Sequence, residues 1–510
     1  RAEQLFAPLG LRLVFGHNKT QHWCPLRETV VPNMGHIPRV SSLPCVGATL
    51  PYTQTAGITE LNIQGDRQPL EKVLQELNTL TGHVCELCGA GLPLDDALTL
   101  HRTFADGAIT HHLRANYVDG TWCARWDQAV QQFWTARVTL RPLASDQMAQ
   151  LTIGGSDGGL GLQTATFRRQ AAYLGSWELC LQHVAEALQQ ASAEGFRAAA
   201  PQIVATIEAA AADYRGLHEK TSAYRFEWEH LIGQSQPQRQ GILMEDVNTA
   251  KLSELLNQLG EADKADVHSA GGAGSLGFLD TGYTSGGVRM SDLQLRTAIR
   301  RKLRYPNPAF EPNAERNPIP ATHCHKQYAR STERPTGGVC GKALDSRGVH
   351  AVHCDVGGGV QSGHDAIRDW LARKLHTWTG MKTLTEQFVP QWDRKVPVRN
   401  AAGVIQQDAQ GAVRTIVVRA KLDVQFYDTK GRLAYADVHI VSAQSLHAPT
   451  LQSYAAKPGK AAEDGEKRKR NKYKAASNPH AGLVPFVIEA LGRPGASAMN
   501  LLRAMAPKDA

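Results

Sequence analysis

Two successive strand patterns, each interrupted by a single aspartate, constrain this 510-residue chain more than any other stretch. Apolar and polar residues alternate over 421–428 and 435–441, and a Lys-Gly pair at 430–431 supplies the turn of a β-hairpin. Aspartate is a poor strand residue and is costly to bury without a partner, so Asp423 and Asp437 need an explanation. Either the two carboxylates hold a divalent cation, or the hairpin has one solvated face.

The composition is that of a folded, multidomain chain. Hydrophobic residues make up 42% and charged residues 20%, and 510 residues suffice for two to four domains. No run of about 18 apolar residues occurs and the N-terminus lacks a signal-peptide pattern, so we expect no membrane segment. The net charge of +8 favours an anionic partner.

The cysteines and the first residue bear on location and completeness. Nine cysteines, an odd number, do not suggest a disulfide framework, so we expect an intracellular, reducing compartment. The chain begins with Arg1 rather than Met, from which we expect a piece of a longer polypeptide.

Along the chain, short strand patterns at 11–15 and 30–31 give way to helical ones near residue 66. A glycine cluster at 154–162 lacks the lysine and hydroxyl residue of a phosphate-binding loop, so a tight structural turn explains it better. The Gly- and Ser-rich break at 270–287 predicts a loop or lid. Apolar spacing predicts helices from about 69 and over 95–103, 121–137, 167–190 and, after a capping Ser291 or Asp292, up to 304.

Cysteines and histidines gather at spacings that suit zinc. The cluster comprises Cys340, His350, His353 and Cys354, with His323, Cys324 and His325 just upstream. Tetrahedral zinc needs four such ligands. Cys324 is our candidate for the fourth, although spacing leaves a neighbouring histidine open, and ordinary surface histidines are the alternative to a zinc site. Cys85 and Cys88 form a second Cys-x-x-Cys without a following ligand pair, which favours a packed helix edge.

A strand and a basic helix flank the aspartate hairpin. Glu386 lies in a strand pattern over 382–389, after a helix that we expect to open at His364 with Trp370 on its apolar face, and a long loop over 391–414 follows. Beyond the hairpin, Lys469 and Lys472 share one face of a helix. The alternative to a phosphate-binding role for this helix is a solvated basic face.

In this order, the segments resemble the C-terminal half of the polyprotein of non-LTR retrotransposons that carry a restriction-like endonuclease. Residues 340–354 resemble the zinc knuckle before that nuclease, and Gly363-His364-Asp365 resembles its Arg-His-Asn segment. Asp423 matches the aspartate of the Arg/Lys-Pro-Asp motif, and Asp437 matches the second acidic residue. Residues 469–473 resemble the basic helix that supplies the catalytic lysine in this variant of the PD-(D/E)XK fold.

The chain departs from the family at three positions. Leu422 replaces the motif proline, Gly363 replaces an arginine, and Gly337 stands where the family has the first knuckle cysteine.

Residues 1–180 resemble the end of the reverse transcriptase palm and its thumb. No aromatic-x-Asp-Asp strand turn occurs, so polymerase activity is not implied, and Asp95-Asp96 at a helix start needs only a capping role.

The resemblance implies a multidomain chain, with α-rich reverse transcriptase thumb and connection regions followed by an α/β restriction-endonuclease-like domain. The expected parts are a palm remnant at 1–65, a thumb-like region at 66–180, a helical connection at 181–305, a Pro-rich linker at 306–320, a zinc-knuckle-like segment at 321–360 and the endonuclease domain at 361–507.

The implied function is nicking of target DNA, whose 3′ end primes reverse transcription of the element RNA in a nuclear location. Asp423 and Asp437 would hold Mg²⁺, helped by Glu386, while Lys469 or Lys472 stabilises charge on the phosphate. Zinc would be structural. Residues expected to contact nucleic acid are His364, Arg368, Arg468, Arg470 and Tyr473. The alternatives are a catalytically inactive remnant that only binds nucleic acid and a helical protein-interaction scaffold.

Overall fold

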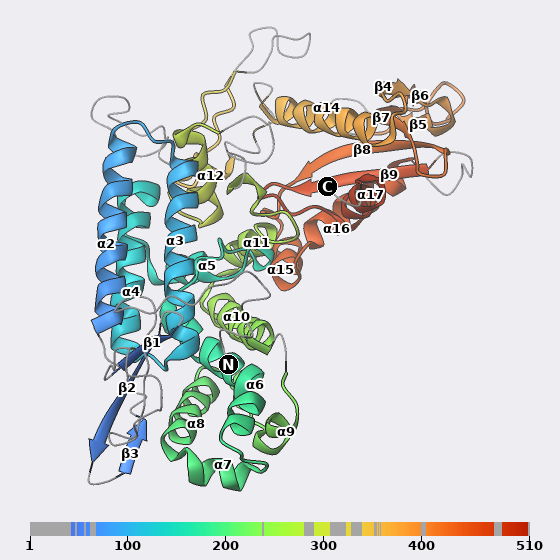
Figure 1. Ribbon diagram of the computed structural model, residues 1–510. Coiled ribbons are helices and arrows are strands. Elements are labelled where there is room, and N and C mark those ends of the chain that lie inside the picture. The colour runs from blue at the N-terminus through green and yellow to red at the C-terminus, as the bar shows by residue number, and fades with distance from the viewer. Residues whose placement is uncertain are drawn as a thin grey trace. The chain divides into compact units, whose positions relative to one another are not determined.

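The computed structural model is mostly helical with one small mixed sheet (Figure 1). The chain divides into two compact units, Arg1–Leu143 with Leu162–Glu254, and Ala144–Gly161 with Leu255–Ala510. No helix among the residues described has the length and apolar character needed to cross a bilayer. The structure describes residues 42–45, 48–55, 58–61, 68–236, 239–279, 290–306, 323–327, 339–350, 354, 356, 359–398, 404–473 and 482–507.

The first unit is a packed set of helices. Leu74, Leu77 and Val84 are buried at the helical spacing that predicts α2. Asp127 accepts hydrogen bonds from the first two backbone N–H groups of α6, which explains where that helix begins. Its helices are α2 (Gln68–Gly89), α3 (Leu94–Ala115), α4 (Gly120–Phe133) continued by the π-helical η2 (Trp134–Thr139), α6 (Ala165–Ala187), α7 (Ala193–Ala199), α8 (Pro201–Gly216), the short η4 (Glu219–Thr221), α9 (Trp228–Gly233) and most of α10 (Arg239–Gln258).

Three antiparallel strands precede these helices, β1 (Ser42–Cys45), β2 (Ala48–Thr55) and β3 (Ile58–Leu61). The strand patterns at 11–15 and 30–31 lie outside the described residues. The predicted helices over 95–103 and 121–137 are confirmed within a longer and a bipartite helix. The helix predicted over 167–190 is confirmed as α6, which ends at Ala187.

The second unit begins with α5 (Ser145–Thr152) and the glycine cluster, which forms the turn η3 (Gly155–Asp157). A Cβ added at Gly158 would lie 2.1 Å from the Val267 carbonyl oxygen, and one at Gly159 would lie 2.0 Å from that of Ile153. The cluster is thus a close-packed turn, as predicted. Next come α11 (Glu261–Ser269), η5 (Gly277–Leu279) and α12 (Asp292–Lys302), which Ser291 caps. Most of the predicted linker lies outside the described residues.

The α/β part contains a four-stranded sheet of order β4-β7-β8-β9, in which only β8 and β9 are parallel. Buried residues of α14 and α17 share one core with the sheet, and those of α15 and α16 share another. The elements are α14 (Gly359–Thr379), β4 (Leu384–Phe388), η8 (Pro390–Trp392), β5 (Arg394–Pro397), β6 (Thr415–Val418), β7 (Lys421–Tyr427), β8 (Leu433–Val441), α15 (Ala448–Ala456), α16 (Lys460–Tyr473), β9 (Gly482–Glu489) and α17 (Ala496–Met505).

Two expectations for this part need correction. The segment expected to be a long loop contains strands β5 and β6, which pair with each other as a two-stranded ribbon. Pairing across a gap of this length leaves no local signal, and Pro397 argues against a strand in the sequence. Helix α14 begins at Gly359, so His364 lies inside it, and Trp370 is 38% exposed rather than part of the buried face.

Candidate functional site

The two hairpin aspartates lie where strands β7 and β8 part. Their ladder ends with the pair Val424 and Ala436, one residue short of Asp423 and Asp437. Beyond that point β7 continues against β4, and β8 continues against β9. The backbone N–H of Val438 donates to Asp423 Oδ2 at 2.7 Å. The fork therefore brings the carboxylates together, and a backbone donor orients one of them.

Lys469 reaches this pair from helix α16. Its Nζ lies 2.6 Å from Asp437 Oδ2, and Asp437 is only 3% exposed. The attraction is that of a buried ion pair. Helix α16 can come this close because Gly465 faces the sheet, where a Cβ would lie 2.9 Å from a methyl group of Val487. Lys469, which the helical register favours, is thus the lysine in contact.

Burial and charge separate the pKa values of the two aspartates. Burial raises the pKa of Asp437 against the opposing attraction of Lys469, and the neighbouring Asp423 raises it further. Burial also acts to raise the pKa of Asp423, but hydrogen bonds from His364 and from the Val438 N–H lower it overall. One carboxyl group therefore ionises readily, whereas the other holds its proton more tightly. A bound divalent cation would favour ionisation of both.

His364, which was predicted to contact nucleic acid, contacts the side chains of Asp423 and Asp365 in the structure. Its Nε2 lies 3.2 Å from Asp423 Oδ2, and its Nδ1 lies 3.3 Å from Asp365 Oδ1. The hydrogen bond to Asp423 is the main cause that raises the pKa of His364. His364 therefore orients the Asp423 carboxylate. The sequence could not show this contact, because the two residues are 59 positions apart and meet only through the packing of α14 on β7.

The prediction that Glu386 helps to hold the cation needs correction. Glu386 lies in β4 at the position opposite Asp423, but the ladder skips it and its φ is +58°. This left-handed conformation is strained for a residue with a side chain. Its carboxylate pairs with Arg368 at 2.8 Å and with Lys421. Among the described residues, Glu386 does not join the two aspartates in a cluster of converging metal ligands.

The residues predicted to contact nucleic acid differ in their exposure and in the partners that they already have. Arg368 is already paired with three carboxylates, and Arg470 with Glu466 and the Ser497 hydroxyl. Tyr473 is 3% exposed and packs in the core against Trp392 and Tyr435, so its predicted surface contact is wrong. Arg468 is exposed and stays a prediction. Lys472 lies over the Tyr473 ring, 4.6 Å from its centroid.

The sequence reasoning missed His439. It lies two residues after Asp437 on β8, so both side chains belong to the face that Lys469 covers. Burial and then the nearby Lys469 and Arg468 lower the pKa of His439 to about 4. A neutral imidazole therefore borders the ion pair. Period-two spacing from Asp437 is the signal that could have found it.

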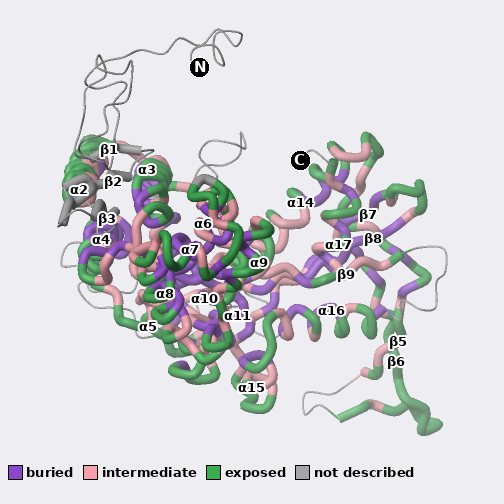
Figure 2. Tube along the Cα trace, turned by 60° about the horizontal axis from the view of Figure 1, so that its bottom comes forward, coloured by how far each residue is buried: buried purple, intermediate pink, exposed green. Residues whose placement is uncertain are grey.

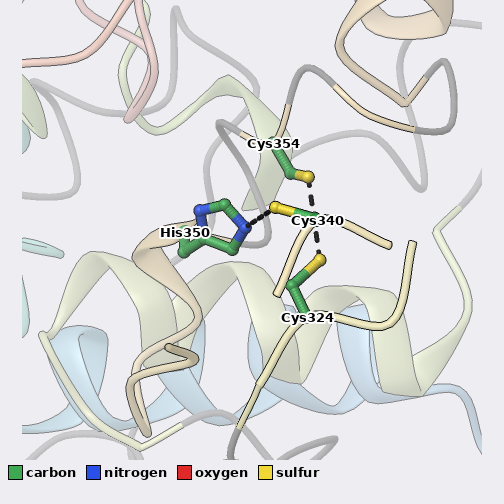
Figure 3. A group of neighbouring side chains, drawn as sticks. All are labelled: Cys324, Cys340, His350 and Cys354. Carbon is green, nitrogen blue, oxygen red and sulfur yellow. Dashed lines mark hydrogen bonds between the residues drawn. The ribbon is translucent and has the colours of Figure 1, made fainter. Parts of the chain in front are cut away.

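The candidate zinc ligands converge from three short segments (Figure 3). Backbone hydrogen bonds pair the segment of Cys324 with that of Cys340, including Cys324 N–H to Lys342 O at 2.8 Å and Gly341 N–H to Cys324 O at 3.0 Å. The Asp345 carboxylate accepts from three N–H groups of the following turn, including that of His350, and so presents this histidine. Cys354 is buried and completes the set.

The geometry of this cluster suits a tetrahedral metal ion. The Sγ atoms of Cys324 and Cys354 lie 3.7 Å apart, and Cys340 Sγ lies 3.3 Å from His350 Nε2. Tetrahedral Zn–S bonds of about 2.3 Å place two sulfur ligands roughly 3.7 Å apart. All four ligand atoms lie within 4.8 Å of one another, so the cluster can bind a metal such as zinc. The backbone N–H of Lys326 lowers the pKa of Cys324, in the direction that thiolate ligation needs.

Cys324, not a neighbouring histidine, is the fourth candidate ligand. His323 and His325 are exposed on either side of it, because alternate residues of an extended segment face opposite ways. His353 lies outside the described residues. Cys85 and Cys88 lie half-buried on helix α2, in keeping with a helix edge.

Comparison with known proteins adds no assignment. The chain matches no family model, and no curated protein sequence is similar to it. The chemistry of the site therefore rests on its residues.

Proposed function

We propose that the second unit is a Mg²⁺-dependent endonuclease that nicks DNA, and that the chain derives from a retrotransposon polyprotein with a reverse transcriptase thumb upstream. The observation that carries the proposal is the Asp437–Lys469 ion pair beside Asp423 at a fork between two strands. An α/β unit with helices on both faces of a mixed sheet suits the restriction-like fold that the resemblance implies. The partners would be target DNA and element RNA.

Each residue has a defined task in this proposal. Asp423 and Asp437 would hold the cation, and His364 keeps the Asp423 carboxylate oriented and ionised. When bound, Mg²⁺ polarises the scissile phosphate and makes a water molecule nucleophilic near neutral pH. Lys469, which contacts Asp437, would neutralise the charge that develops on the phosphate oxygens. Two carboxylates and one ammonium group are therefore the minimal equipment for the reaction.

The test is conversion of supercoiled plasmid to the open circle with and without Mg²⁺. Asp423→Asn and Asp437→Asn should each reduce the nicking rate by at least about a hundredfold, because a metal site supplies several kcal/mol of transition-state stabilisation. The control is Glu208→Gln, which removes an exposed carboxylate from helix α8 and should leave the rate unchanged. Unchanged nicking in both aspartate variants would exclude this site.

A catalytically inactive nucleic-acid-binding protein is the second candidate. The ion pairs of Glu386 with Arg368 and Lys421 favour it, because they keep a third acidic ligand from the cation. In that case the unaltered protein binds duplex DNA but produces no nicks at any Mg²⁺ concentration.

A further inference from the structure

The ribbon of strands β5 and β6 is an exposed arm of the second unit. Arg394 pairs with Val418 at its base and Pro397 with Thr415 further out. Hydrogen bonds from Val398 N–H to Arg414 O and from Gln406 N–H to Val398 O continue the pairing. Figure 2 shows the ribbon largely in the colours of exposed and half-buried residues. Two-stranded ribbons are marginally stable alone in water, so an arm of this kind gains from a partner.

Both faces of the ribbon are open. Ile416 and Val417 point to opposite faces because they are adjacent in a strand, yet they are 56% and 60% exposed. Neither face therefore packs on the rest of the unit. A partner that meets this arm must accept apolar side chains as well as charge.

The charge on the arm is almost entirely positive. From 394 to 419 the sequence carries five basic residues and the single acidic residue Asp408. The Asp408 carboxylate accepts from the backbone N–H groups of Gln410 and Ala412, within its own turn. Within the described residues, neither Arg394 nor Arg414 pairs with a carboxylate, in contrast to Arg368 and Arg470. Unpaired cations on an exposed arm fit a polyanion.

The base of the arm is fixed to the candidate active site. Trp392 is 2% exposed and its ring lies 5.5 Å from that of Tyr435 and 6.1 Å from that of Tyr473. Asp393 closes the base by accepting from the Ala420 N–H at 2.7 Å. Tyr473 belongs to α16, the helix that carries Lys469. The position of the arm is therefore set by the same helix that contacts the acidic pair.

We propose that the β5–β6 ribbon binds the backbone and groove of duplex DNA beside the nicked phosphate. The five extended residues 394–398, four of them in β5, span about 16 Å, or roughly five base pairs. The major groove admits a two-stranded ribbon. By the strand register Arg394, Arg414 and Ile416 share one face, on which the two cations suit phosphates and the apolar side chain suits thymine methyl groups. The inference rests on the proposed function, since it takes the substrate of that site to be duplex DNA.

The test compares Arg394→Gln/Arg414→Gln with Arg373→Gln/Lys374→Gln, which removes two exposed charges from α14. Binding of a 30-base-pair duplex is followed by fluorescence anisotropy across a salt series. The ribbon variant should lower the slope of log affinity against log salt by about 1.8, or 0.9 for each lost phosphate contact. The α14 variant should change the slope by less than half of that. Equal slopes for the two variants overturn the proposal.

Two further measurements separate this proposal from others. The charge-conserving Arg394→Lys/Arg414→Lys should bind as the unaltered protein does, whereas loss of binding there would mean that the ribbon is only structural. If the unaltered protein fails to nick, the nuclease proposal fails while the binding slopes still test the ribbon. Unchanged DNA binding with loss of self-association in sedimentation would assign the ribbon to a second copy of the chain and overturn it.

Discussion

The Asp437 carboxylate and the Lys469 ammonium group are both largely buried, at 5% and 15% side-chain exposure. Removing one partner from such a pair leaves an uncompensated charge, which costs about 3–5 kcal/mol. We therefore expect Asp437→Asn and Lys469→Met each to lower the free energy of unfolding by about that amount. The double variant should be less destabilised than the sum of the two, because no lone charge remains. Urea unfolding at pH 7 measures this, and additive losses would contradict the pair.

His101 supplies a pH-dependent prediction in the first unit. It is fully buried, stacked on Phe133 with centroids 4.1 Å apart, and burial lowers its pKa from 6.5 to about 4. The unfolded chain binds the proton of His101 more tightly than the folded chain does. The contribution of neutral His101 to the free energy of unfolding is therefore complete above pH 6.5 and is lost as pH falls toward 4. From pH 7.5 to pH 4.5, the free energy of unfolding should fall by about 2–3 kcal/mol more in the unaltered protein than in His101→Phe.

The control for this prediction is His230→Gln, which removes an exposed histidine from helix α9. It should keep the pH dependence of the unaltered protein in urea unfolding at the same two pH values. Identical pH dependence in His101→Phe would show that the His101 ring is not a source of acid sensitivity.

At the scale of elements, the paired segments around Cys324 and Cys340 determine the metal site. We expect one zinc ion per chain by elemental analysis, lost in Cys324→Ser because Cys324 supplies one of the four ligand atoms that converge among the described residues. His325→Ser should keep its zinc, since His325 is exposed and outside the cluster. Loss of zinc in His325→Ser alone would reverse the assignment.

Helix α16 depends on Gly465 for its close approach to the sheet. An added Cβ would lie 2.9 Å and 3.0 Å from methyl groups of Val487 and Val441, so Gly465→Ala must push the helix outward. Overpacking of this kind costs about 1–3 kcal/mol, and nicking should fall as Lys469 moves away. Gly107→Ala, on helix α3 with open space around it, should instead stabilise by up to about 1 kcal/mol. Thermal unfolding and plasmid nicking distinguish the two variants.

For the whole molecule, the net charge of +8 predicts nucleic-acid binding that weakens steeply with salt. Binding should survive in an Asp423→Asn/Asp437→Asn double variant, because removal of two anions does not reduce attraction to phosphate. Anisotropy with duplex DNA across a salt series measures this. Absence of salt-dependent binding in both proteins would favour the protein-interaction scaffold.

The local features of this chain were predictable because they depend on neighbouring residues. Alternation and a Lys-Gly turn predicted the β7–β8 hairpin, and apolar spacing predicted helices α2, α3, α4 and α6. Ser291 was predictable as a helix cap for the same reason, because its hydroxyl accepts a hydrogen bond from the backbone N–H of Gln294, three residues later. The fork between β7 and β8, the pairing of β5 with β6 and the convergence of the three cysteines with His350 were not predictable in this way.

What the sequence determined by itself is therefore the set of reactive groups: two aspartates on a hairpin, a basic helix, and cysteines and histidines at ligand spacing. Only the tertiary structure decided which of them meet. It joined His364 to Asp423, turned Glu386 toward Arg368, and chose Cys324 over its histidine neighbours. The physical reason is that these contacts depend on how α14, α16 and the paired segments pack, and long-range packing leaves no periodic signal in one sequence.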